Sequence, residues 1–177
     1  MLTETQKYRI MEVVDAAMQQ RGEIVNSYSQ IEFLFADLIA KMRNHHAYEG
    51  TITGMPFRPE SRISVLTRLL SMDGPLKRYH DDLAPLIEDF KQFEDDRHFL
   101  THGFASASVS PESNIILEFR KFAPSKDNQW HISYRHYTPA KFKYLRESIS
   151  EFSHRALLVF RRVYLELRLE ETDVLNP

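Results

Sequence analysis

Residues 23–46 read EIVNSYSQIEFLFADLIAKMRNHH, and this stretch decides the fold class. Its apolar side chains recur every three or four positions, which is the period of one face of an α-helix. A stripe this continuous has to pack against other apolar surfaces, so the stretch predicts a helix in the core of a helical bundle. The side chains on the predicted inner face are Ile24, Val25, Tyr28, Ile31, Phe35, Leu38, Ile39 and Met42.

Similar patterns on either side predict further helices. Gly22 is expected to end the helix that precedes this stretch, because glycine is common just past a helix end. Thr138 and Pro139 open the last helix, since threonine can cap the backbone and proline fits the first helical position. The further helices are expected at residues 4–20, 60–72, 76–102 and 139–170. The inner face of the last one is expected to hold Phe142, Leu145, Ile149, Phe152, Ala156, Phe160, Val163 and Leu167.

Between residues 104 and 137 the apolar period changes to two, which is typical of β-strands. Trp130, Tyr134 and Tyr137 are expected to pack this segment against the helices, because large aromatic side chains gain much from burial. The strands are expected at residues 104–109, 114–122 and 130–137, with a hairpin turn at residues 126–129.

The predicted fold class is therefore mainly α, an antiparallel up-and-down bundle of about five helices. A β-hairpin or β-meander over residues 104–137 is inserted before the last long helix. The whole chain, residues 1–177, is expected to form a single domain, because its length is typical of one domain.

The composition excludes several classes of protein. The chain carries a formal net charge of −2 and no cysteine, so disulfides and thiolate chemistry are ruled out. The first residues, MLTETQKYRI, lack the apolar region of a secretory signal, and no stretch is long and apolar enough to span a membrane. We therefore expect a cytoplasmic protein with no membrane partner.

Two charged residues interrupt the apolar stripes. Glu32 lies seven residues from both Val25 and Ile39, and Arg97 lies seven residues after Phe90. A buried charge is costly without a partner, so each is expected to be paired, and Glu32 is the obvious partner for Arg97 within the chain. Ordinary explanations stay open, since Glu32 can pair with any neighbouring cation and Arg97 can extend its charged end to the edge of the bundle.

The segment Arg97-His98-Phe99-Leu100-Thr101-His102 lies at the end of a predicted helix and is followed by Gly103. In it an arginine precedes a polar residue, and a histidine stands five positions after the arginine. This pattern resembles the signature of the HEPN superfamily of nucleotide-binding and RNA-cleaving domains. The resemblance covers about residues 20–165, because the order of the helices and the inward Glu32 on an early helix are also similar to that family.

The resemblance implies a metal-independent endoribonuclease that acts as a homodimer on RNA and uses no cofactor. His102 would act as general acid or base when the RNA 2′-hydroxyl attacks the adjacent phosphorus, since the pKa of histidine lies near neutrality. Arg97 would stabilise the charge that grows on the phosphate oxygens, with His98 and Glu32 in support. Further candidate RNA contacts, on the β insertion, are Arg120, Arg135 and Tyr137. Such an enzyme fits a toxin or an antiphage defence component that is held in check by an antitoxin or another partner protein.

Two alternatives compete with this interpretation. Glu94, His98 and His102 are spaced four residues apart and would share one face of their helix, as the ligands of a metal ion can. The same fold could also serve as a non-catalytic module that binds nucleotides or another protein, with Arg97 merely paired to Glu32.

Overall fold

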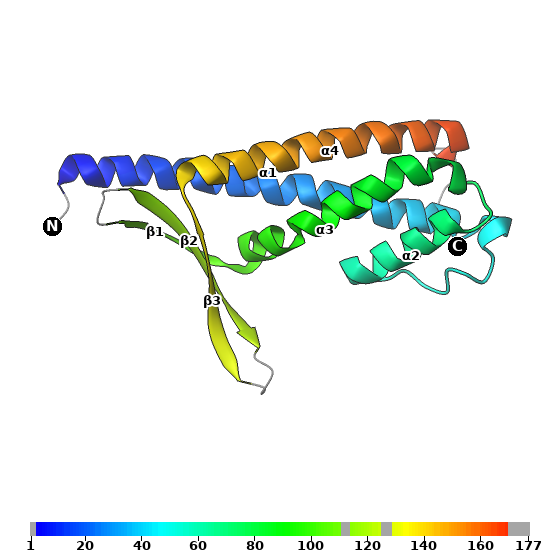
Figure 1. Cartoon of the computed structure of the whole chain (residues 1–177), viewed down its shortest axis with the longest axis horizontal. Coiled ribbons are helices and arrows are strands. Elements are labelled where there is room, and N and C mark those ends of the chain that lie inside the picture. Colours follow the sequence, from blue (N-terminus) through cyan, green and yellow to red (C-terminus); the bar gives the residue numbers. More distant parts are fainter. Residues whose placement is uncertain (1–2, 111–113, 125–128, 170–177) are drawn as a thin grey trace. The chain divides into compact units, whose positions relative to one another are not determined.

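The computed structural model describes residues 3–110, 114–124 and 129–169. In these ranges the chain forms four α-helices and one three-stranded antiparallel sheet that precedes the last helix (Figure 1). The helices are α1 (Glu4–Met42), α2 (Pro59–Ser71), α3 (His80–His102) and α4 (Pro139–Leu167), and the strands are β1 (Phe104–Val109), β2 (Ile115–Pro124) and β3 (Trp130–Tyr137). The predicted class, mainly helical with a small β insertion, is confirmed. Residues 126–128 of the predicted turn and residue 170 at the predicted end of the last helix lie outside the described ranges.

A single helix, α1, takes the place of the first two predicted helices, so the prediction that Gly22 ends a helix is wrong. Ala17 and Ile24 are both buried and lie seven residues, or two helical turns, apart. One continuous apolar face therefore runs past Gly22, which is itself exposed. A glycine inside a helix costs only about 0.5–1 kcal/mol relative to alanine, which is less than the helix gains by keeping this face in register.

The chain divides into two compact units, and α1, α3 and α4 each contribute residues to both. The first unit comprises Met1–Ser27 and Phe93–Ser150, and the second comprises Tyr28–Gln92 and Glu151–Pro177. No described helix is both long enough and apolar enough to cross a membrane. The expectation of a single domain stays a prediction.

The core of the second unit is built on stacked aromatic rings. Tyr28 stacks on Phe90 with ring centroids 4.2 Å apart, and Phe35 meets Phe90 edge-on at 5.1 Å. The Tyr48 ring is fully buried below Gly74, and the Tyr48 hydroxyl accepts a hydrogen bond from the backbone N–H of Leu76 at 2.9 Å. The inner faces predicted for α2 and for the second-unit part of α4 are confirmed, apart from Leu167, which is half-buried.

The first unit places the sheet against helices on one face only. Leu117, Phe119 and Tyr137 are buried together with side chains of α1, α3 and α4, among them Leu100 and Phe142. Strand residues alternate between two faces, so their neighbours along each strand point the other way. Beyond Arg120 the strand β2 pairs with β3 alone, and Figure 1 shows these two strands continuing past β1.

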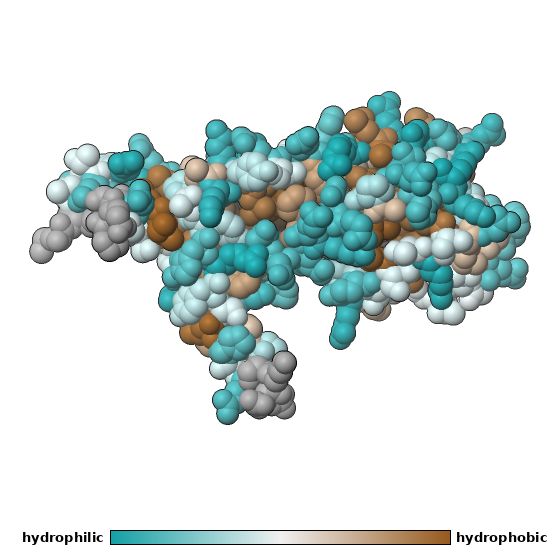
Figure 2. All heavy atoms as spheres, viewed as in Figure 1, coloured by the Kyte–Doolittle hydropathy of each residue, from teal (hydrophilic) through white to brown (hydrophobic). Residues whose placement is uncertain are grey.

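The face of the sheet turned away from the helices carries large apolar side chains. We call it the outer sheet face, and its exposed apolar members are Phe104, Phe122, Trp130, Ile132 and Tyr134. Figure 2 shows apolar side chains at the surface of the hairpin among polar ones. The prediction that Trp130 and Tyr134 pack on the helices is wrong, because both sit at even-numbered strand positions, opposite the buried odd-numbered ones. Tyr137 alone of the three packs inward.

Two glycine substitutions are expected to act in opposite directions on stability. An added Cβ at Gly22 meets nothing within 4 Å, so Gly22→Ala should raise the free energy of unfolding by about 0.5–1 kcal/mol. At Gly74 the added Cβ would lie 2.7 Å from the Tyr48 ring, which is buried and cannot move aside, so Gly74→Ala should lower it by about 1–3 kcal/mol. Urea unfolding followed by circular dichroism measures both. An unchanged Gly74→Ala variant would contradict the packing of Tyr48 on this turn.

Candidate functional site

The end of α3 is held from outside the helix by Arg21 of α1. Arg21 Nε donates a hydrogen bond to the Leu100 carbonyl at 2.5 Å, and Arg21 Nη2 donates to the Gly103 carbonyl at 3.2 Å. The last carbonyls of a helix have no partner within it and carry its negative dipole end, so a guanidinium suits both needs. Arg21 was not predicted from the sequence, since 79 residues separate it from Leu100 and no local pattern connects them.

Gly103 turns the chain from α3 directly into β1. Its N–H donates to the Phe99 carbonyl at 2.7 Å, and a Cβ at this position would collide with that same backbone oxygen. The reason for glycine is therefore lack of space, and the left-handed backbone found among the five glycines belongs to Gly50 instead. Because of this turn, Gly103 alone separates His102 at the end of α3 from Phe104 at the start of β1.

Positive side chains gather around His98 at the end of α3. The ring centroids of His98 and His102 lie 5.0 Å apart. Phe99 follows His98 in the sequence, and Lys121 of β2 places its Nζ 4.3 Å from the centre of the Phe99 ring. Although His98 is exposed, partial desolvation lowers its pKa, and the charges of Lys121, His102 and Arg97 lower it further against an opposing effect of Asp95. A neutral imidazole at neutral pH follows from this environment.

The pKa of Lys121 is lowered in the same way. Partial burial is the main cause, with Arg135 and Arg97 adding to it and Asp95 opposing it. Lys121 was not singled out from the sequence, although its place next to Arg120 on an alternating strand puts it on the helix-facing side. Clusters of perturbed titratable groups are typical of functional sites. Arg97 takes part in this cluster as a half-buried cation whose Nε is shielded from solvent.

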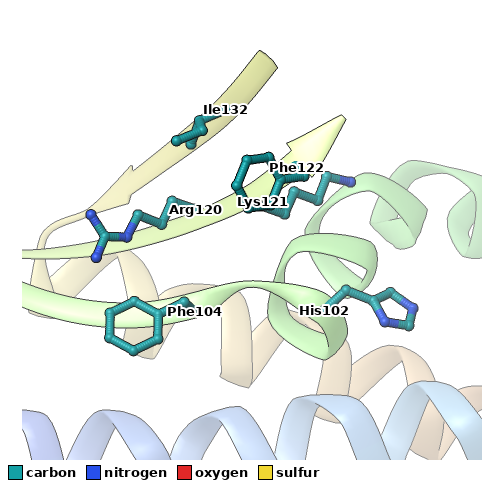
Figure 3. A pocket seen from close by; sticks show the side chains of 6 residues that line it. All are labelled: His102, Phe104, Arg120, Lys121, Phe122 and Ile132. Atoms are coloured by element: carbon teal, nitrogen blue, oxygen red, sulfur yellow. The ribbon is translucent and has the colours of Figure 1, made fainter. Parts of the chain in front are cut away.

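A pocket of about 370 Å³ opens beside this cluster. Figure 3 shows Arg120 and Lys121 leaving β2 toward opposite sides, with Phe104 below Arg120 and the His102 imidazole on the side of Lys121. The Arg120 guanidinium lies 4.9 Å from the centre of the Phe104 ring, a cation–π contact. The pocket thus joins two residues predicted for the site, His102 and Arg120. Its full lining is His102, Phe104, Arg120, Lys121, Phe122 and Ile132.

Two other predicted RNA contacts have structural partners instead. Asp96 accepts hydrogen bonds from both Arg135 Nη1 and the Tyr137 hydroxyl, each at 2.5 Å, and burial together with Asp96 raises the pKa of Tyr137. Tyr137 is 9% exposed, so its ring has no open face for a base, and this burial speaks against Tyr137 as an RNA contact, which stays a prediction. Arg135 forms an ion pair with Asp96, and its guanidinium carbon also lies 4.9 Å from the centre of the Phe99 ring.

Glu32 is paired, as its position on the inner stripe predicted, and the partner is Arg62 of α2. Arg62 Nη1 lies 2.8 Å from Glu32 Oε1, and Arg62 Nε donates to the Pro56 carbonyl at 2.8 Å. Glu32 and Arg62 both belong to the second unit, whereas Arg97 belongs to the first. The Glu32–Arg62 pair thus ties α1 to α2 and to the chain that leads into α2.

The predicted metal ligands do not form a site. His98 and His102 are neighbours, yet within the described ranges no three His, Asp or Glu side chains are arranged to hold a metal ion. The alternative that uses Glu94, His98 and His102 therefore has no support among the described residues and stays a prediction.

In comparisons with known proteins, the chain matches no protein-family model, and neither a curated protein nor a solved structure is significantly similar to it.

The titration of His98 tests the charge cluster. We expect the pKa of His98 to lie below the usual value of about 6.5 and to rise in Lys121→Gln, because removing a neighbouring positive charge favours the protonated imidazole. Histidine ring signals followed by NMR against pH give both values. His45 serves as control, because its pKa is lowered by burial and by His46 and should be the same in both proteins. A His98 pKa that is indifferent to Lys121→Gln would contradict the cluster.

The Asp96 hub is expected to stabilise the first unit. Asp96→Ala leaves Arg135 and the Tyr137 hydroxyl without their acceptor in a part-buried place, which should cost about 1–3 kcal/mol of unfolding free energy. The neighbouring Asp95 is the matched control, since its carboxylate is 88% exposed and 3.7 Å from Arg135. Asp95→Ala should cost less than about 1 kcal/mol. Equal losses in urea unfolding would show that Asp96 has no special role.

Proposed function

We propose that the protein is a HEPN-like endoribonuclease that cleaves RNA by attack of the 2′-hydroxyl on the adjacent phosphorus. One observation carries the proposal: the rings of His98 and His102 lie 5.0 Å apart, Arg97 and Lys121 place positive charge near His98, and the adjacent pocket is lined by cationic but no acidic residues. Phosphate is drawn to such a place by charge, and two imidazoles are the side chains best suited to move protons there near neutral pH.

The lowered pKa of His98 suggests its role. A neutral imidazole can take the proton of the 2′-hydroxyl, so His98 acts as general base while the 2′-oxygen forms its bond to phosphorus. The bond from phosphorus to the 5′-oxygen then breaks, and that oxygen receives a proton from His102 in its protonated form. The products are a 2′,3′-cyclic phosphate and a 5′-hydroxyl. His98 has gained one proton and His102 has lost one.

Arg97 and Lys121 would stabilise the negative charge that grows on the phosphate oxygens in the transition state. A guanidinium and an ammonium supply the positive charge that a metal ion supplies in other nucleases, so this scheme needs no metal. Arg120, on the other side of the pocket, would hold a neighbouring phosphate. Unregulated RNA cleavage harms a cell, which makes a toxin or antiphage role, with a protein partner as inhibitor, part of the proposal.

A homodimer belongs to the proposal as well. Arg97 and His102 are five residues apart on α3, which is about 140° of rotation and about 7.5 Å of rise, so the two side chains leave the helix in different directions. A two-fold axis beside α3 would let one copy supply the arginine and the other the histidine. Mixing Arg97→Ala with His102→Ala protein would then restore activity that neither has alone.

The test is cleavage of single-stranded RNA by the purified protein in the presence of EDTA. His102→Ala and His98→Ala should each lower kcat by about 10²- to 10⁴-fold, and Arg97→Ala by about 10²- to 10³-fold. His154→Ala and Arg161→Ala, exposed residues of α4 outside the site, are the matched controls and should cleave as the unaltered protein does. Because His98 must be neutral to act as base, the acid limb of the pH profile should have its midpoint below about 6.5.

Activity that survives all three substitutions in well-folded variants would refute the assignment of these residues. Products that end in a simple 3′-phosphate or 3′-hydroxyl from the start of the reaction, with no cyclic phosphate, would refute the mechanism.

A further inference from the structure

The outer sheet face carries several large apolar side chains. Its apolar side chains are open to solvent, with Trp130 72%, Phe122 71% and Phe104 62% exposed. Cross-strand pairing brings Phe122 opposite Ile132 and Arg120 opposite Tyr134. Contiguous exposed apolar surface of this kind marks an interaction site more often than chance.

The charges on this face favour an anionic partner. Arg120 projects from the middle of the face and covers the Phe104 ring. The acidic Glu118 is already engaged, with Glu118 Oε2 2.9 Å from His136 Nε2 and Glu118 Oε1 within hydrogen-bond distance of Ser106. Among the described residues Glu118 is therefore not the partner of Arg120, whose positive charge can meet a ligand, and Phe104 and Tyr134 flank Arg120 on the two neighbouring strands.

The spacing of the rings suits unpaired nucleobases. Side chains two positions apart on a strand are about 6.8 Å apart, twice the roughly 3.4 Å rise of stacked bases, so a base can lie between neighbouring side chains on one face. Tyr134 and His136 already present parallel rings, inclined by 2°. Base–aromatic stacking tolerates any base, because every base has a flat face.

The outer sheet face leads into the pocket at His102. Phe104, Phe122 and Ile132 line that pocket as well as belonging to the face. A strand of RNA whose bases lie on the outer sheet face would therefore pass its backbone beside Arg120 and toward His102.

A second copy of the chain fits this face less well. An interface between two copies related by a two-fold axis sets the same patch against itself, so Arg120 would approach its own counterpart across an apolar contact. Nucleic acid brings the opposite charge and flat apolar surfaces together, which complements both features of the face.

We infer that the outer sheet face, through Phe104, Phe122, Trp130, Tyr134 and Arg120, is a stacking platform that binds unpaired bases of single-stranded RNA next to the pocket at His102. The inference deepens the proposed function by naming the form of RNA, and it rests on that function only for the choice of RNA as the nucleic acid.

Trp130 is the one tryptophan of the chain, so its fluorescence reports on the platform directly. The probe is a single-stranded oligonucleotide with 2′-O-methyl sugars, which lacks the attacking hydroxyl and so binds without being cut. Stacking of a base on the indole should quench the Trp130 fluorescence, and the quenching should reach a plateau as the oligonucleotide concentration rises. A duplex of the same sequence and length should quench much less, because its bases are already stacked and paired.

Substitutions separate stacking from charge. Phe122→Ala and Tyr134→Ala should each raise the Kd by about five-fold to about a hundred-fold, because each removes the stacking of one base. Arg120→Gln should reduce the slope of log Kd against log salt by about 0.7, the value for one phosphate contact with a single strand. Phe57→Ala is the matched control, an aromatic residue that is 89% exposed in the second unit, and should bind as the unaltered protein does.

The outcomes distinguish the platform from the nuclease. Quenching by the single strand with no cleavage of ordinary RNA would leave the platform standing and reject the catalytic proposal. Cleavage with unchanged Kd in Phe122→Ala and Tyr134→Ala would do the reverse. The platform is also overturned if RNA binds without quenching, if duplex binds as tightly, or if sedimentation shows self-association that Phe122→Ala abolishes, since a second copy would then cover the face.

Discussion

The capped turn at the end of α3 is the constraint on which the candidate site depends. Arg21 holds the Leu100 and Gly103 carbonyls, and Gly103 leaves no room for a side chain against the Phe99 oxygen. A helix end is normally the part that frays, yet here a guanidinium from another helix compensates both its open hydrogen bonds and its dipole. His102 and the first residue of β1 are therefore set in a fixed relation, and the pocket beside them follows from that relation.

The sheet adds to this site by dividing its residues between two faces. Odd-numbered positions such as Phe119 and Tyr137 anchor the sheet on the helices, and the same face carries Lys121, whose charge acts on His98. Even-numbered positions hold Arg120 and the exposed rings. Lys121 and Arg120 thus leave β2 on opposite faces of the sheet, and both line the pocket together with His102 of α3. A strand makes this possible because adjacent side chains point apart by geometry alone.

The neighbouring carboxylates Asp95 and Asp96 of α3 have different surroundings. Asp96 accepts hydrogen bonds from Arg135 and Tyr137 and so fixes β3 to α3. Asp95 is exposed, and it opposes the lowering of the His98 and Lys121 pKa values to which Arg97 contributes. The pKa of His98 is lowered first by partial desolvation and then by the charges of Lys121, His102 and Arg97. The anionic ligand that we propose would meet these cations even though the whole chain carries a net charge of −2.

Periodicity in the sequence determined the helical class, the three strands and most of the buried positions, because burial repeats with the geometry of each element. It failed at Gly22, where tertiary packing outweighs the local preference of glycine, and at Trp130, whose size suggested burial although its strand position faces outward. It identified Glu32 as a residue that needs a cation but not Arg62 as that cation. Arg21, Lys121 and the commitment of Tyr137 to Asp96 were likewise decided only by the tertiary structure, because contacts between residues tens of positions apart leave no trace in local spacing.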